Sequence, residues 1–219
     1  DSKDENYLLL LIGLIACKIA TSGEKLRLDN GSLSTWAFHA RPDAARVFAL
    51  PNNDGWVYVS NSEHRSYIDG KMRWGGGVGG IYFNNKGAIT DYKRLMTGGK
   101  NNCGAGKTPW NTLVSCEEHS EGQCWEVDPF GVNPTNRTEL GMSNFESFAY
   151  DYRDPRAPYF FVTEDSRRGA LRRYRPAATV VDENVPWKML TLSEGRLMYL
   201  HLTPHLRNAG TFEWTDDFD

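Results

Sequence analysis

The sequence lacks an excess of basic residues, a paired cysteine motif and a long apolar run. Its 219 residues contain 25 lysines and arginines against 28 acidic residues, a formal net charge of −3. This balance argues against a nucleic-acid-binding protein, which needs a basic surface. No Cys-x-x-Cys pair occurs among the four cysteines, which argues against a structural zinc ribbon. No His-Glu-x-x-His spacing links the five histidines, so none of them stands out as a metal ligand.

The longest apolar run, Tyr7 to Cys17, is too short for a transmembrane helix, which needs about 20 residues. Its length suits the centre of a signal peptide, although the acidic flank at residues 1–6 has the wrong charge. A buried helix or pair of strands is an equal alternative. Residues 1–35 are therefore predicted to form a separate N-terminal segment, and residues 36–219 the main domain.

From residue 36 onward, the apolar residues form short groups rich in aromatic and β-branched side chains and separated by turns. With 21 glycines and 10 prolines, this pattern is typical of strands joined by tight turns. No long helical pattern follows. The chain is predicted to be all-β, with strands near residues 56–60, 79–83, 88–92, 112–116, 123–127, 159–163, 171–174 and 196–202.

Three of these strands end in acidic residues about fifty residues apart, at Glu63, at Glu117 and Glu118, and at Glu164 and Asp165. A repeat of that length with about four strands is typical of a β-propeller blade. Equivalent ends of blades face one axis, so these acids are predicted to lie together. About three to four blades fit into residues 36–219, which predicts an incomplete propeller, and residues 210–219 stop within the pattern.

The segment Cys116-Glu117-Glu118 is the strongest candidate for chemistry, because a thiolate and carboxylates together can bind a transition metal or calcium. Glu146, between two phenylalanines, is a further candidate ligand. A disulfide, either Cys103–Cys116 or Cys116–Cys124, is an equal alternative in an oxidising compartment. Two sequons, at Asn30 and Asn136, are candidate glycosylation sites.

One long stretch resembles a known family. Asn102-Cys103, Gly104-x-Gly106, Thr108-Pro-Trp110 and Ser115-Cys-Glu-Glu118 resemble the signature of the PhoX-type alkaline phosphatases and their relatives, many of them without a known activity. The similarity extends over roughly residues 36–219 and includes residues 56–63, 75–78, 145–146 and 161–165.

The resemblance implies a six-bladed β-propeller in which iron and calcium ions bind phosphate esters and polarise the phosphoryl oxygens. Cys116 would then be an iron ligand, and the candidate metal ligands would be Glu63, Glu117, Glu118, Glu146 and Glu164. The alternative is a non-catalytic propeller that binds protein partners within a larger complex. The enzyme hypothesis predicts a phosphate ester substrate, an unpaired Cys116 and converging acids. A secreted, periplasmic or organelle-lumenal location fits either hypothesis.

Overall fold

The computed structural model describes residues 15–69, 71–192, 194–206 and 209–216. The described residues form antiparallel sheets, none of them closed, with one short helix, so the prediction of an all-β chain is confirmed. The described part contains no helix that is long and apolar enough to cross a bilayer. Of the apolar run at residues 7–17, residues 7–14 lie outside the described residues. From Ile15 the chain has no helix or strand until β1.

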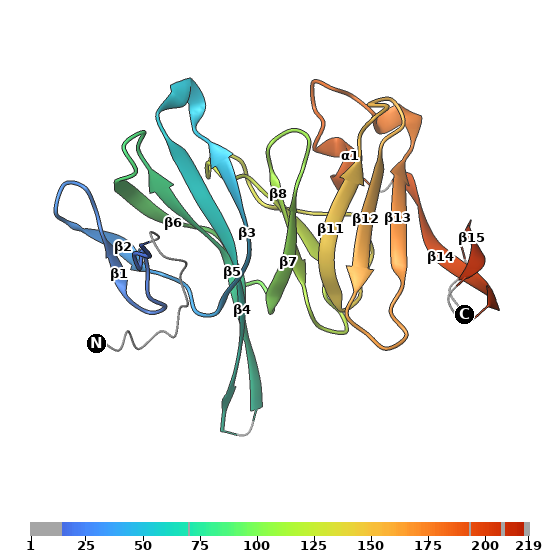
Figure 1. The fold of residues 1–219 in the computed structure, drawn as a ribbon, viewed down its shortest axis with the longest axis horizontal. Helices are drawn as coiled ribbons and strands as arrows, with labels where there is room; N and C mark the ends of the chain where they lie inside the picture. The colour runs from blue at the N-terminus through green and yellow to red at the C-terminus, as the bar shows by residue number, and fades with distance from the viewer. Residues whose placement is uncertain (1–14, 70, 193, 207–208, 217–219) are drawn as a thin grey trace.

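The first large sheet has its four strands in chain order (Figure 1). They are β3 (Pro42–Ala49), β4 (Trp56–Ile68), β5 (Lys71–Phe83) and β6 (Ile89–Thr97), with a 3₁₀ turn at Pro51–Asn53. The hairpin expected from residues 79–92 is confirmed, because Phe83 pairs with Ile89. The strand expected at residues 56–60 is much longer, since β4 pairs with β5 over its whole length. The resulting hairpin projects beyond the other sheets (Figure 1).

The second sheet lies beside the first and is also antiparallel. Its strands are β7 (Asn102–Lys107), β8 (Leu113–Glu117), β9 (Cys124–Val127) and the short β10 (Asn136–Arg137). All five residues of β8 are buried. A sheet with both faces covered needs an apolar neighbour on each side.

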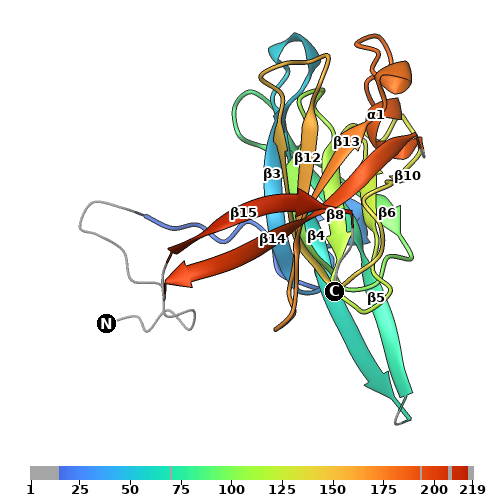
Figure 2. The ribbon, with the colours of Figure 1, turned by 90° about the vertical axis from the view of Figure 1, so that its right-hand side faces the viewer.

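The third sheet contains five strands in chain order. They are β11 (Phe145–Asp151), β12 (Tyr159–Glu164), β13 (Leu171–Pro176), β14 (Gly195–Leu206) and β15 (Ala209–Thr215). The 3₁₀ turn Ala178–Val180 and the helix α1 (Lys188–Thr191) lie between β13 and β14. The β14–β15 ribbon crosses the direction of the other strands (Figure 2). A small sheet of β1 (Lys25–Arg27) and β2 (Leu33–Ala37) packs beside β6.

Two apolar clusters hold the large sheets together, and neighbouring residues of β8 supply both. Leu113 packs with Phe48 and Val57 of the first sheet, whereas Val114 packs with Phe148 and Phe160 of the third. Successive side chains of a strand point to opposite faces, which explains the division. The three sheets therefore stand side by side with the second in the middle (Figure 1).

Candidate metal centre

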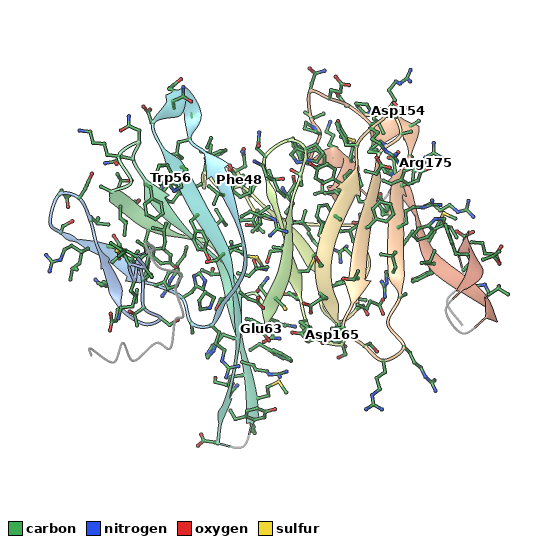
Figure 3. All side chains as sticks on the ribbon, in the orientation of Figure 1. Phe48, Trp56, Glu63, Asp154, Asp165 and Arg175 are labelled. Carbon is green, nitrogen blue, oxygen red and sulfur yellow. A yellow bond between two sulfur atoms is a disulfide. The ribbon has the colours of Figure 1, made fainter. Side chains whose placement is uncertain are left out.

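The antiparallel pairing brings the first two strands of each large sheet to a common end. Pro42 pairs with Ser62, Asn102 with Glu117, and Phe145 with Glu164. The start of each first strand therefore faces the end of the second strand in the second and third sheets, and the middle of the longer β4 in the first. Figure 3 shows Glu63 of the first sheet and Asp165 of the third at this same end. The acids and the thiol gathered there, here called the acid–thiol cluster, are Asp43, Glu63, Cys103, Glu118, Glu146 and Asp165.

Cys103, Glu118 and Glu146 form the centre of the acid–thiol cluster. Their ligand atoms all lie within 4.8 Å of one another. The Cys103 Sγ lies 3.1 Å from Asp43 Oδ2 and 3.6 Å from Glu146 Oε2. A thiol and carboxylates at this spacing are a donor set for a transition metal ion.

Asn101 joins two carboxylates of the cluster from the turn before β7. Its Nδ2 lies 3.4 Å from Glu63 Oε1 and 3.3 Å from Glu118 Oε2. Its backbone is in the left-handed region, at φ 55°, where asparagine is among the more tolerant residues. The buried Asn101 Oδ1 has no hydrogen-bond partner among the described residues. An amide oxygen of this kind could serve as a neutral ligand beside the carboxylates.

The electrostatics of the cluster favour a bound cation. Burial raises the pKa of Glu118 to about 7, with further contributions from a hydrogen bond to Asp165 and from the carboxylates of Glu63 and Glu146. Burial also raises the pKa of the Cys103 thiol, as does its hydrogen bond to Asp43. Among the described residues, no lysine, arginine or histidine forms an ion pair with a carboxylate of this cluster. The donor set therefore fits a cation that would balance these charges.

Comparison with known protein families gives a match for part of the chain. Residues 44–128 match the family model of the alkaline phosphatase PhoX. The resemblance is therefore confirmed for this segment. A search of curated proteins and a search of solved structures each found no match.

The PhoX match covers part of the acid–thiol cluster. It runs from β3 to the residue after β9 and contains Glu63, Cys103 and Glu118. Glu146 and Asp165, from the third sheet, lie outside it. The match thus includes the thiol and two carboxylates of the cluster, and the packing of the sheets brings the remaining carboxylates to them.

Cys116, expected from the resemblance to PhoX to be an iron ligand, is placed elsewhere by the structure. It is buried in the apolar cluster between the second and third sheets, in a disulfide with Cys124. The two residues face each other across β8 and β9. Cys103 is the free thiol among the carboxylates, whereas the free Cys17 is exposed near the N-terminus. The sequence pattern suggested Cys103 only as a disulfide partner, although it lies near the start of a first strand at the acidic end.

Glu117 and Glu164, two other predicted metal ligands, also lie outside the acid–thiol cluster. Glu117 is buried, and it accepts hydrogen bonds from the backbone amides of Lys100 and Gln123 at 2.8 and 3.1 Å. Glu164 pairs with the Arg172 guanidinium and accepts a bond from the Ala170 amide. Each precedes a cluster acid in the chain, and adjacent strand residues face opposite sides.

The two glycosylation candidates are not part of the acid–thiol cluster. Asn30 is exposed in the turn between β1 and β2, where its Oδ1 accepts a hydrogen bond from the Ser32 amide at 2.9 Å. Asn136 is half-buried in β10. Their modification remains a prediction.

Proposed function

We propose that the acid–thiol cluster is the metal centre of a phosphomonoesterase of the alkaline phosphatase PhoX type. The observation that carries this proposal is that the free Cys103 thiol lies close to the carboxylates of Glu118 and Glu146. The family match includes Cys103 and Glu118. A bound ion would supply Lewis-acid polarisation of the phosphoryl oxygens of a phosphate ester.

The donor types suggest which ions the residues would hold. Thiolate sulfur suits a transition metal, so Cys103 with Glu118 and Glu146 would hold iron. Calcium prefers six to eight oxygen ligands, and the oxygens of Glu63, Asp165 and Asn101 would contribute to such a site. The carboxylates are also held in position relative to one another, because Asn101 bridges two of them.

For the architecture, we propose that the three large sheets are successive blades of a propeller, of which this chain holds an incomplete set. Their strands follow in chain order, and their first strands pack together: Arg46 Nη2 of β3 donates to the carbonyl oxygen of Ala105 of β7 at 2.9 Å, and β7 contacts β11. A propeller axis beside β3, β7 and β11 would explain why each sheet contributes acids to one end.

A non-catalytic binding module is the second candidate function. It is favoured by the Cys116–Cys124 disulfide, which this hypothesis predicted, whereas the enzyme hypothesis predicted an unpaired Cys116. The convergence of the acids favours the enzyme, with Cys103 as the thiol. The disulfide also supports a location in an oxidising compartment, such as the cell exterior, the periplasm or an organelle lumen.

Elemental analysis of the purified chain tests the metal centre. We expect the wild type to retain iron and calcium after gel filtration, and Cys103→Ser to lose iron by at least about tenfold, because a hydroxyl is a poor substitute for a thiolate. Turnover of p-nitrophenyl phosphate, measured on the same samples, should fall with the iron content.

The matched control is Glu183→Gln, which removes an exposed carboxylate outside the cluster. It should leave metal content and turnover unchanged. Metal retained with no turnover in added calcium would favour the binding module. The absence of iron in the wild type, with unchanged metal content in Cys103→Ser, would disprove the proposed metal centre.

A further inference from the structure

A second site lies at the opposite end of the second sheet from the acid–thiol cluster. A cavity of about 400 Å³ opens beside the β7–β8 loop, the turn after β9 and the segment before α1. Its walls include Trp110, Trp187, Pro134 and Pro186, and its acids are Glu126 and Asp128. Cavities of this size hold small organic molecules. In Figure 1 the β7–β8 loop and α1 stand at the end away from the labelled Glu63 and Asp165 of Figure 3.

Glu126 is the unusual residue of this cavity. It is only 3% exposed. Its Oε1 accepts hydrogen bonds from Trp110 Nε1 at 2.5 Å and Thr112 Oγ1 at 2.7 Å, which fixes the side chain. Its Oε2 is buried and has no hydrogen-bond partner in the part of the chain that the structure describes. A buried carboxylate oxygen without a donor is costly, so a structural role for Oε1 alone does not explain an acid here.

Asp128, two residues after Glu126 and just beyond the end of β9, is the second acid of the cavity. It accepts hydrogen bonds from the backbone amides of Phe130, Val132 and Asn133 at 2.8, 3.2 and 2.8 Å, which fixes its carboxylate. The residues that line the cavity include no basic side chain. No lysine, arginine or histidine in the described part of the chain pairs with either acid. No basic side chain of the described residues therefore balances the two acids of this cavity.

The walls select the kind of cation. Two indoles and two prolines offer apolar and aromatic surface, and Trp187 is 41% exposed at the rim. Such walls favour an organic cation over a hydrated metal ion, which would need several oxygen ligands. Both oxygens of Asp128 already accept hydrogen bonds and Glu126 Oε2 is enclosed, so a cationic ligand would be held by the charges of the two carboxylates and by the indole faces rather than by a hydrogen bond to Oε2.

We propose that this cavity binds a small organic amine, whose ammonium group lies beside the carboxylates of Glu126 and Asp128 while its apolar body packs on Trp187 and the prolines. The proposal does not depend on the metal centre, because the two sites occupy opposite ends of β7 and β8. Burial, with the charge of Asp128, raises the pKa of Glu126 in the empty protein, and an ammonium ligand would favour the ionised form.

Titration with phenethylamine tests the site, with 2-phenylethanol as a probe of similar shape without the charge. The readouts are the dissociation constant from calorimetry and the indole N–H resonance of Trp110, which reports on its bond to Glu126. We expect the amine to bind at least about tenfold more tightly than the alcohol and to shift that resonance. Equal binding of both probes, or no resonance shift with the amine, would overturn the proposal.

The variant Glu126→Gln keeps the shape and an acceptor for Trp110 and Thr112 but removes the charge. We expect it to lose the preference for the amine, while Glu183→Gln retains it. A preference that survives Glu126→Gln contradicts the assignment. Should Glu126→Gln fail to fold, Trp187→Ala at the exposed rim serves instead: weaker binding of both probes supports the site, and unchanged binding contradicts it.

A further probe tests whether the ammonium group belongs to a free amine or to a lysine side chain of a protein. N-acetyl-lysine amide presents the same group on a peptide unit. Weaker binding than phenethylamine supports a small-molecule ligand. Tighter binding would indicate a lysine side chain of a protein and overturn the assignment to a free amine.

Discussion

Gly104 is the residue at which β7 meets β11. A Cβ atom at this position would overlap the carbonyl oxygen of Glu146, so no other residue fits without moving a strand. Because Cys103 and Glu146 flank this contact, we expect Gly104→Ala to destabilise the fold by about 3 kcal/mol and to reduce metal retention. Urea unfolding and elemental analysis measure the two effects.

Gly98 provides the matched control for this substitution. Its φ of 79° strains any other residue, but a Cβ atom added there would meet no other atom within 4 Å. Gly98→Ala should therefore cost only about 1 kcal/mol and leave the metal content unchanged. Equal effects of the two variants would show that the contact of β7 with β11 does not control the cluster.

The residue that sequence reasoning missed was the thiol. Cys116 adjoins Glu117 and Glu118 in the chain, which made it the obvious partner of the acids. In the fold, β8 ends at Glu117, and Glu118 turns toward Asn101, whose carbonyl oxygen accepts its amide hydrogen at 3.0 Å. Cys103 reaches the acids through the pairing of β7 with β8 and through the packing of β7 against β3 and β11, which spacing in the sequence does not reveal.

At the scale of the element, β8 and β9 are joined by the Cys116–Cys124 disulfide, separated by 8 residues in sequence. Closing a loop of that size stabilises a fold by about 2–3 kcal/mol. We expect the double variant Cys116→Ala/Cys124→Ala to lose about that much free energy of unfolding, by urea titration, and to keep its iron. If this variant folds stably but loses iron, Cys116 would instead be a metal ligand, as the resemblance implied.

Most strands could be predicted, because their aromatic and β-branched residues stand between turn residues. The strand at residues 159–163 and its partner at 171–174 are examples, since β12 and β13 pair there. The extension of β4 to Ile68 could not be predicted: residues 61–68 are largely polar, and only their pairing with β5 makes them a strand. The shared acidic end was predictable from the repeat, but which acid of each pair faces it was not.

At the scale of the whole molecule, a half-buried histidine should make stability depend on pH. His39, after β2, contacts Tyr92 of β6 at 3.0 Å and Ser60 of β4 at 3.1 Å through its two ring nitrogens. Burial lowers its pKa from 6.5 to about 4. The unfolded chain therefore binds the proton first, and stability is lost as the pH falls from about 6.5 to about 4, by on the order of 2 kcal/mol.

Urea unfolding of the wild type and His39→Gln at pH 7, 5.5 and 4 measures this contribution. We expect the difference in stability between the two proteins to be largest at pH 7 and to shrink toward pH 4. A difference that stays constant over this range would show that His39 is not held neutral by the fold.

The two-faced burial of β8 has a consequence for synthesis on the ribosome. The second sheet leaves the ribosome before the third, so the face that carries Val114 stays bare until β11 and β12 arrive. That interval is when the nascent chain is most exposed to misassociation. Cys103 and Glu146 come from these two sheets, so the proposed metal ion, held by both, would be captured only after the third sheet docks, and its uptake would report that docking.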